Sequence, residues 1–372
     1  MRRLWLRVHR WFALSIGWVL ALQGLMGATL VVGRPLQVWS HPQLFKAPVA
    51  EQGATRASLE SVRQSLVASF GTSTDFTFRP PRDADDTLWV LVRGPWSGTV
   101  YVDPVSGREL GRLGETDGFV NIVFRTHSSL WLGDTGKLIL ACIALSYLFL
   151  LVTGLVLWWP RRWPPSFKVA LGAGTLRAFV DLHRTGGALL GLLIAVSVAT
   201  GAYMAWRPLG DLITSLSGGR SVKAPAIPKG DKSADVPPLP VDQLVTIAQT
   251  RFSGAPVGYV QVPSQPTRPV RVRFKLSDDP HPNGLTSVWL HPRTGAILGA
   301  VRWNELDPGA RAVAVVYPLH TGELGGAALE ALVAIGGLTL GMLGITGVWL
   351  WWRRRGRPAP SPTRRPTAEP LG

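Results

Sequence analysis

The stretch HRTGGALLGLLIAVSVATGAYMAW at residues 183–206 decides the fold, because it is a membrane-length segment that begins with histidine and arginine. An earlier stretch, HRWFALSIGWVLALQGLMGATLVV at residues 9–32, begins in the same way. Glycines recur at the same offsets, Gly17 and Gly27 in the first copy and Gly191 and Gly201 in the second. About 20 apolar residues are needed to span a bilayer. Both stretches therefore predict spanning helices with a histidine at one end.

Two further apolar segments, at residues 138–159 and 332–352, also reach this length, so we expect four spanning helices. The first apolar run is longer than the core of a signal peptide, and we expect it to remain uncleaved. The second and fourth helices also match. His127 lies as far before Trp158-Trp159 as His320 lies before Trp351-Trp352, and Thr153-Gly154 matches Thr346-Gly347 in that register.

The sequence thus predicts a membrane α-helical bundle of four transmembrane helices with an internal twofold repeat and two extracytoplasmic α+β modules. In the first half we expect a helix at 1–33, an outer module at 34–126 and a helix at 127–160. In the second half we expect a cytoplasmic connector at 161–178, a helix at 179–206, an outer module at 207–319, a helix at 320–355 and a disordered tail at 356–372. Helices related by the repeat should face each other, the first toward the third and the second toward the fourth.

Each outer module should contain one helix and an antiparallel sheet. We expect helices at 58–70 and 241–252, and strands at 75–78, 87–92, 98–103, 270–276 and 286–291. Each module then reaches a proline turn that ends in glycine, Asp103–Gly107 in the first and His291–Gly295 in the second. We expect the Asp103 side chain to hold its turn by a local hydrogen bond. Residues 217–240 have the composition of a linker.

The net charge of +16 invites a nucleic-acid interpretation, but its distribution favours a membrane. Arginines gather near the N-terminus, in the 160–187 connector and after residue 352, all beside ends of the predicted helices. The positive-inside rule then places both termini and the connector in the cytoplasm, in contact with the lipid bilayer and with no nucleic-acid partner. The single cysteine, Cys142, lies in a predicted helix and excludes a disulfide framework.

A His-Arg start on a membrane helix, an α+β module ending in Asp-Pro-x-x-Gly and a closing helix ending in Trp-Trp-Pro-Arg-Arg resemble the PepSY-associated transmembrane family. The resemblance covers about residues 3–355. It implies PepSY-like outer modules and a multi-pass protein of the bacterial inner membrane, because the family includes iron-regulated inner-membrane proteins and ferric-siderophore reductases. For the reductases it implies haem b held by helix histidines and electron delivery to iron chelates outside the membrane. One departure is that His291 stands where the first module has Asp103.

Four histidines are the candidate ligands of haem iron. His9 and His183 lie at the cytoplasmic ends of the first and third helices, where two axial imidazoles would make a low-spin electron-transfer centre. Gly187 and Gly191 follow His183 on one helix face and either admit a flat macrocycle or let helices pack closely. Arg10 and Arg184 either pair with haem propionates or anchor the helix ends at the membrane surface.

His127 and His320 lie toward the outer ends of the second and fourth helices and are the candidate ligands of a second haem b. If each helix continued straight, its histidine would stand about 15 Å above the hydrocarbon edge. A bend at Gly325-Gly326 would instead fold His320 back. The alternative is that both are ordinary surface or capping residues. His41, His281 and His291 each precede a proline, and we expect them to be structural or solvent-exposed. The alternative is that they capture copper or iron.

The leading hypothesis is a di-haem b inner-membrane reductase that passes electrons outward to a ferric siderophore or other iron chelate and so serves iron uptake. No flavin or nicotinamide module is recognisable, so electrons would come from quinol or a cytoplasmic donor. The alternative is a non-enzymatic membrane protein whose outer modules bind or regulate a periplasmic partner. A transporter fits less well, because no predicted span has an ionisable residue at its centre.

Overall fold

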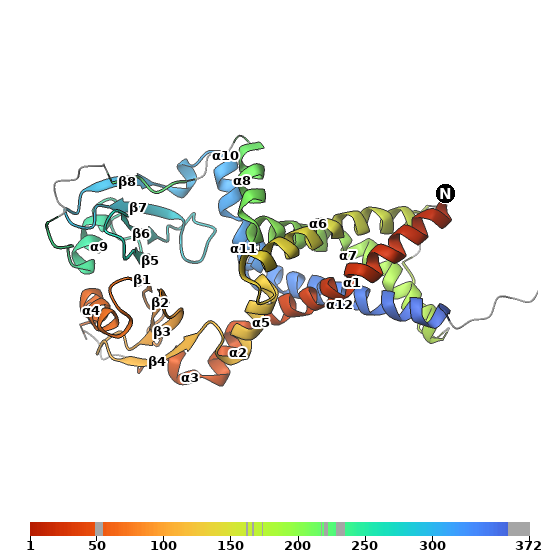
Figure 1. The fold of residues 1–372 in the computed structure, drawn as a ribbon, viewed down its shortest axis with the longest axis horizontal. Helices are drawn as coiled ribbons and strands as arrows, with labels where there is room; N and C mark the ends of the chain where they lie inside the picture. Colours follow the sequence, from red (N-terminus) through yellow and green to blue (C-terminus); the bar gives the residue numbers. More distant parts are fainter. Residues whose placement is uncertain are drawn as a thin grey trace, which may run out of the picture.

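The computed structural model describes residues 1–48, 55–160, 163–165, 167–172, 174–216, 218, 222–227 and 235–355. A bundle of long helices forms one end of the molecule and an antiparallel sheet with two helices forms the other (Figure 1). The tail expected at 356–372 and much of the linker expected at 217–240 lie outside the described residues.

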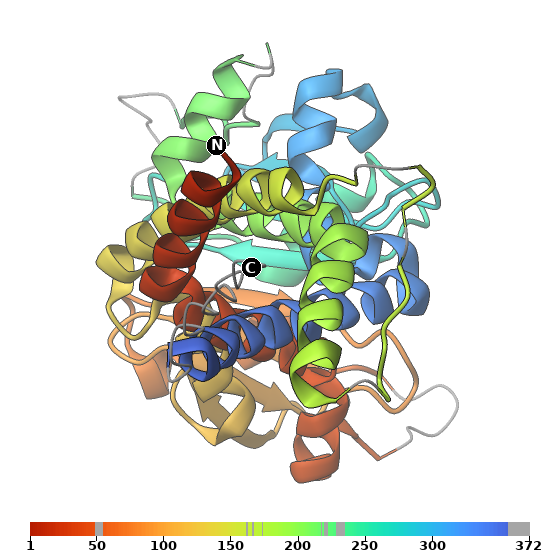
Figure 2. The same ribbon diagram turned by 90° about the vertical axis from the view of Figure 1, so that its right-hand side faces the viewer.

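Four helices are long and apolar enough to cross a membrane, as the sequence predicted. They are α1 (Arg2–Val31), α6 (Gly133–Trp158), α7 (Thr175–Ala205) and α12 (Gly326–Arg355). Viewed along the bundle they follow the order α1, α6, α7, α12 around a ring (Figure 2). α1 and α7 therefore lie diagonally opposite each other and face the same central space, as do α6 and α12.

Glycines bring α1 and α12 into backbone contact. A Cβ atom added at Gly24 would lie 2.6 Å from the carbonyl oxygen of Gly337, and one added at Gly344 would lie 2.7 Å from that of Gly17. Small residues allow such close approach in membranes, where packing rather than a hydrophobic driving force holds helices together. This pair of helices closes one side of the ring.

We call the end of the molecule that carries the sheet the outer end, and the sheet with its covering helices the outer domain. The sheet is a single one of eight antiparallel strands in the order β4-β3-β2-β1-β5-β6-β7-β8. The strands are β1 (Asp75–Arg79), β2 (Leu88–Arg93), β3 (Gly98–Val102), β4 (Glu109–Gly114), β5 (Val257–Val262), β6 (Val270–Phe274), β7 (Thr286–Leu290) and β8 (Ile297–Val301). The sequence predicted a separate sheet in each half. Instead, β1 and β5 pair, with Phe78 opposite Val260, and join the two halves.

Alternation along the strands divides the sheet into two faces. Phe76 and Phe78 on β1, like Val270 and Val272 on β6, are fully buried in one core. That core is covered by α4 (Leu59–Phe70) and α9 (Val241–Gln249), which lie on the side of the sheet away from the membrane helices (Figure 1). The opposite face looks toward the helical bundle.

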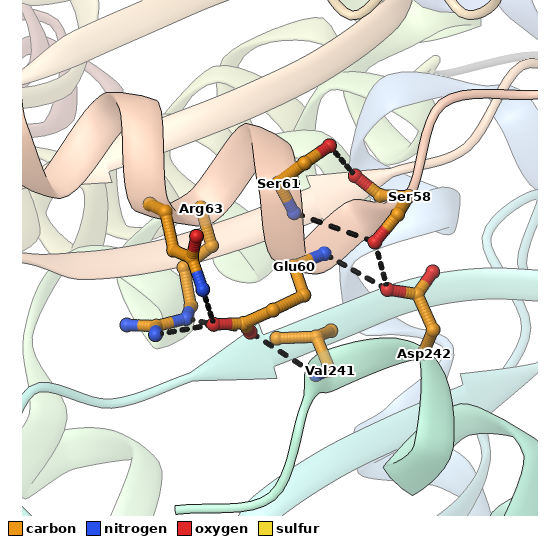
Figure 3. A network of polar contacts seen from close by, with 7 residues as sticks. Ser58, Glu60, Ser61, Arg63, Val241 and Asp242 are labelled. Atoms are coloured by element: carbon orange, nitrogen blue, oxygen red, sulfur yellow. Dashed lines mark hydrogen bonds and ion pairs between the residues drawn. The ribbon is translucent and has the colours of Figure 1, made fainter.

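The two halves cap each other's helices (Figure 3). The Asp242 carboxylate of α9 accepts hydrogen bonds from the backbone N–H groups of Leu59 and Glu60 at 2.9 Å, and from the Ser58 hydroxyl at 2.6 Å. The Glu60 carboxylate of α4 accepts from the Val241 N–H at 3.2 Å in return. Burial raises the pKa of Asp242, but these hydrogen bonds outweigh it and the pKa is lowered. The exchanged caps fix the outer domain as one unit.

Shorter helices connect the bundle to the sheet. They are α2 (Gly33–Ser40), α3 (Pro42–Phe45), α5 (Gly118–Ser129), α8 (Arg207–Leu216), α10 (Pro308–Ala314) and α11 (Val316–Thr321), with 3₁₀ turns at Trp303–Glu305 and Glu323–Gly325. A sharp turn separates α5 from α6 at Leu130 and Trp131, which have left-handed backbone conformations with φ of 49° and 64°. A second turn separates α11 from α12 at Gly322 and Gly326, with φ of 89° and 59°.

The two proline turns are held in the same way despite their different first residues. Asp103 Oδ1 accepts from the N–H groups of Val105 and Ser106 at 2.8 and 2.9 Å, which confirms its predicted local role. His291 Nδ1 accepts from the N–H groups of Arg293 and Thr294, each at 3.2 Å. The substitution of histidine for aspartate therefore preserves the turn.

Candidate functional site

A cavity of about 470 Å³ lies inside the bundle at the end near the N-terminus. His9 of α1 and His183 of α7 both line it from diagonally opposite helices. The rest of the lining is mostly apolar, with Leu14, Leu151 and Leu343 among its walls. Its volume falls within the range of about 300–1,000 Å³ that is usual for ligand and cofactor pockets. The structure therefore brings together the two inner histidines around a space for a sizeable apolar group.

A threonine on the neighbouring helix holds His9 in one tautomer. The Thr153 hydroxyl donates to the Leu150 carbonyl at 3.0 Å, so its oxygen accepts from His9 Nδ1 at 2.8 Å. With its proton on Nδ1, a neutral His9 keeps the Nε2 lone pair free. The hydrogen bond at one ring nitrogen thus selects the other for metal binding.

His183 has the same arrangement on the opposite side of the cavity. The Thr346 hydroxyl donates to the Met342 carbonyl at 2.6 Å and accepts from His183 Nδ1 at 3.0 Å. The two imidazoles are therefore oriented by equivalent threonines on α6 and α12. Both present Nε2 as the available nitrogen.

The glycines of the inner site have different roles. A Cβ at Gly154 would lie 3.5 Å from His9 Cε1, and one at Gly347 would lie 3.6 Å from His183 Cε1, so each imidazole packs on a bare backbone. Gly187 lines the cavity, as the macrocycle interpretation requires. Gly191 does not share this role. A Cβ there would lie 2.6 Å from Leu151 Cδ1, so Gly191 serves helix packing instead.

Arginines and tryptophans line the end of this cavity near the N-terminus of the chain. Arg10, Arg184 and Arg355 line it together with Trp158 and Trp351. Arg184 also approaches the buried Asp181 carboxylate at 3.8 Å. Charge-assisted hydrogen bonds from guanidinium groups are suited to carboxylates such as propionates.

The outer histidines lie on short helices that fold back against the bundle, not on straight extensions of α6 and α12. A Cβ at Gly27 of α1 would lie 3.2 Å from His127 Cε1, and one at Gly201 of α7 would lie 3.1 Å from His320 Cε1. The straight-helix prediction is therefore wrong for both residues. For His320 the structure contains the bend that was the alternative, and it folds the residue back against the bundle. For His127 a left-handed turn at Leu130 has the same effect.

The two outer rings face each other across the bundle axis, with centroids 6.2 Å apart and planes tilted by 33°. Imidazole nitrogens bind transition metals at about 2 Å and lie about 1 Å from the ring centroid, so two axial imidazoles on one iron would place their centroids roughly 6 Å apart. The separation of His127 and His320 fits a shared iron atom.

The tautomer of His320 is fixed by an oxygen that can only accept. His320 Nδ1 lies 3.0 Å from the Ser197 carbonyl oxygen, so it must donate, and Nε2 is left free. Gln23 is the counterpart of Ser197 on α1, and its side chain donates to the Thr126 carbonyl at 3.3 Å, which holds α5 in place. Within the described residues His127 Nδ1 is buried without a hydrogen bond of normal geometry, and the Gln23 backbone is the polar group that acts on its ring.

The family model for the PepSY-associated TM region matches residues 6–354. The chain belongs to this family. The match spans both histidine sites and the whole outer domain between the helices. A search of curated proteins finds no match to the chain.

In this family member the threonines are the site residues that sequence reasoning missed. In the sequence, Thr153 and Thr346 served only to align the two halves. The matching Thr-Gly pairs, Thr153-Gly154 and Thr346-Gly347, were the sequence signal that could have indicated a role beside the histidines. The remaining histidines have structural contacts. His281 Nδ1 accepts from the Asn283 N–H at 3.0 Å, and His41 Nδ1 lies 2.8 Å from the Ser40 hydroxyl.

Proposed function

We propose that this protein is a di-haem b membrane reductase that carries electrons across the inner membrane to periplasmic ferric chelates. One observation carries the proposal. Two pairs of opposed imidazoles lie toward opposite ends of the bundle, and hydrogen bonds leave Nε2 free on His9, His183 and His320. Apolar helix packing alone has no need for such oriented nitrogens.

The proposal includes an internal twofold repeat of helix, PepSY-like module and helix. It is supported by the mirrored strand order about the β1–β5 pair and by the exchanged caps of Asp242 and Glu60. Equivalent contacts at Gly154 and Gly347, and at Gly27 and Gly201, support it further. The arginine-rich helix ends favour cytoplasmic termini and an outer domain in the periplasm.

Within this proposal each residue has a defined task. His9 and His183 would hold the inner haem, His127 and His320 the outer one, and Arg10 and Arg184 would bind the inner propionates. Haem held by two imidazoles supplies reversible one-electron transfer. Thr153 and Thr346 keep the inner imidazoles in the correct tautomer, and the apolar walls exclude water.

The two sites are spaced to conduct across the bilayer. His9 and Gly27, which marks the level of the outer pair, are separated along α1 by about 27 Å at 1.5 Å per residue. This approaches the thickness of the hydrocarbon core, about 30 Å. Electrons would enter beside His9 from quinol or a cytoplasmic donor and leave near His320. Reduction of the chelate would release iron, because ferrous iron binds hard oxygen ligands less tightly.

The test is reduction of a ferric chelate by the purified, lipid-reconstituted protein. The protein is reduced anaerobically with dithionite, freed of reductant and mixed with a ferric chelate and a chromogenic trap for ferrous iron. The proposal predicts reoxidised haem bands and trapped ferrous iron in proportion. A reduced protein that stays reduced in the presence of several ferric chelates would contradict the assigned reaction.

A further inference from the structure

On the face of the sheet that looks toward the bundle, α3 packs Leu44 and Phe45 against Tyr101 and Leu113 at the β3–β4 end. The part of this face on β5 and β6 lies further along the sheet from α3. Arg271 and Arg273 on β6 point to this face, because they alternate with Val270, Val272 and Phe274 of the buried core. Tyr259 and Gln261 on the neighbouring β5 share it by the same alternation. We call this half-buried surface on β5 and β6 the open face, and the neighbouring Ser287 and Trp289 of β7 are buried beside it.

Arg271 carries a positive charge that no carboxylate of the described residues neutralises. Its Nε and Nη2 donate to the Ser287 hydroxyl at 3.1 and 2.8 Å, and its guanidinium lies 5.1 Å from the Trp289 ring centroid. Burial, and then the charge of Arg273, lower the pKa of Arg271 to about 10, so it stays charged at neutral pH. Half-buried charges without a partner are costly. This site therefore favours an anion.

Arg273 adds a second charge beside it. It donates to the Gly284 carbonyl oxygen, its guanidinium lies 5.6 Å from the Tyr259 ring centroid, and its Nε is buried without a partner among the described residues. The nearby carboxylate is Asp279, whose charge acts on Arg273. The pair still has a net positive charge.

Further cations surround this pair. Burial and the charges of Arg273, Arg82 and Lys275 lower the pKa of His281 to about 4, so these three lie close to its ring, which is neutral at pH 7. Arg82 and Arg34 also act on the Glu323 carboxylate, which lies near a third acid of the region, Glu330. Cations thus outnumber acids next to the open face.

A short path of rings leads from the open face to the outer histidine pair. The His281 ring stacks on Tyr317 of α11, with centroids 5.6 Å apart and planes within 23°. Tyr317 lies one helical turn before His320 and so lies on the same side of α11. A ligand bound at Arg271 and Arg273 would face this path.

We propose that the open face, centred on Arg271 and Arg273, is the docking surface for the ferric chelate and selects chelates with net negative charge. The inference rests on the proposed reductase function and adds the class of substrate. Guanidinium groups pair with carboxylate or phenolate oxygens, and the aromatic rings stacked beneath them hold them in place. Neutral chelates of similar size lack that pairing.

Gallium(III) complexes test the docking surface without any electron transfer, because gallium is not reduced under these conditions. A trianionic gallium tris-catecholate and a neutral gallium tris-hydroxamate are titrated calorimetrically into the full-length protein in lipid nanodiscs. The variants are Arg271→Gln, Arg273→Gln and Arg271→Lys. Arg251→Gln is the matched control, because Arg251 is exposed and follows α9 on the other side of the sheet.

The trianion should bind the wild type at least about tenfold more tightly than the neutral complex, a difference of about 1.4 kcal/mol. Each glutamine variant should lose about tenfold in trianion affinity. Arg271→Lys should keep most of it, and Arg251→Gln should match the wild type. An unchanged elution volume and haem spectrum would show that a variant remains folded.

Equal affinity for both complexes, no binding of the trianion, or trianion binding that survives both glutamine substitutions would overturn the docking proposal. These outcomes are independent of the reductase proposal, which fails if the reduced protein cannot pass electrons to any ferric chelate. If the protein reduces neutral and anionic chelates equally well, the reductase proposal stands and the docking proposal for the open face is refuted.

Discussion

The sharpest prediction concerns the two threonines that orient the inner histidines. Thr153→Val and Thr346→Val keep the shape of the side chain and remove the oxygen that accepts from His9 Nδ1 at 2.8 Å and from His183 Nδ1 at 3.0 Å. In the described part of the chain each hydroxyl otherwise bonds within its own helix, so the helices should remain intact. The substitution therefore isolates the effect of imidazole orientation.

The expected loss follows from the role of such outer partners. Removing one costs about 10–100-fold in metal affinity, or about 1.4–2.7 kcal/mol. Without the acceptor, the Nδ1–H tautomer and the ring orientation are no longer selected. The inner imidazole also becomes less basic, so the reduction potential of the inner centre should rise.

The assay is the haem content and reduction potential of each purified variant. Thr29→Val is the matched control, because the Thr29 hydroxyl donates to the Leu25 carbonyl within α1 at 2.9 Å and contacts no histidine in the described structure. Thr153→Val and Thr346→Val should lose inner haem, and the double variant should lose more. If both retain as much haem as Thr29→Val, with unchanged potentials, the tautomer argument is refuted.

Three further outcomes are expected. Gly201→Ala places a methyl group 3.1 Å from His320 Cε1 and should perturb only the outer haem bands. Gly347→Ala makes a looser 3.6 Å contact with His183 and should shift the inner haem bands by a smaller amount. Asp242→Ala should lower the stability of the outer domain by about 1 kcal/mol in thermal unfolding. Because the pKa of Asp242 is lowered on folding, its contribution should be complete above about pH 4 and disappear as the pH falls through the lowered value. Gly24→Val should prevent the contact of α1 with α12 at Gly337, and a variant with unchanged melting temperature would contradict it.

The membrane helices were predictable because apolar length is a local property. The matching offsets of His9 and His183 also indicated, from the sequence alone, that both side chains face one shared space. The position of His127 was not predictable in this way. Its return to the bundle depends on left-handed residues at Leu130 and Trp131, neither of which is a residue type that signals a break.

The outer domain was predicted less completely. Helix 58–70 and the strand that begins at residue 270 agree with α4 and β6, but β4, β5 and β8 were missed because their alternation is weak. The joining of two sheets depends on the pairing of β1 with β5, residues far apart in sequence. The caps exchanged by Asp242 and Glu60 are equally nonlocal and have no signature in either half alone.

The most direct test of the central claim is the absorption spectrum of the purified protein with paired histidine substitutions. The wild type should show a Soret band and contain two haems b per chain. His9→Ala with His183→Ala should leave one haem, and His127→Ala with His320→Ala should leave the other, with a different reduction potential. A colourless wild type, or a protein that keeps its haem when all four histidines are replaced, would contradict the account.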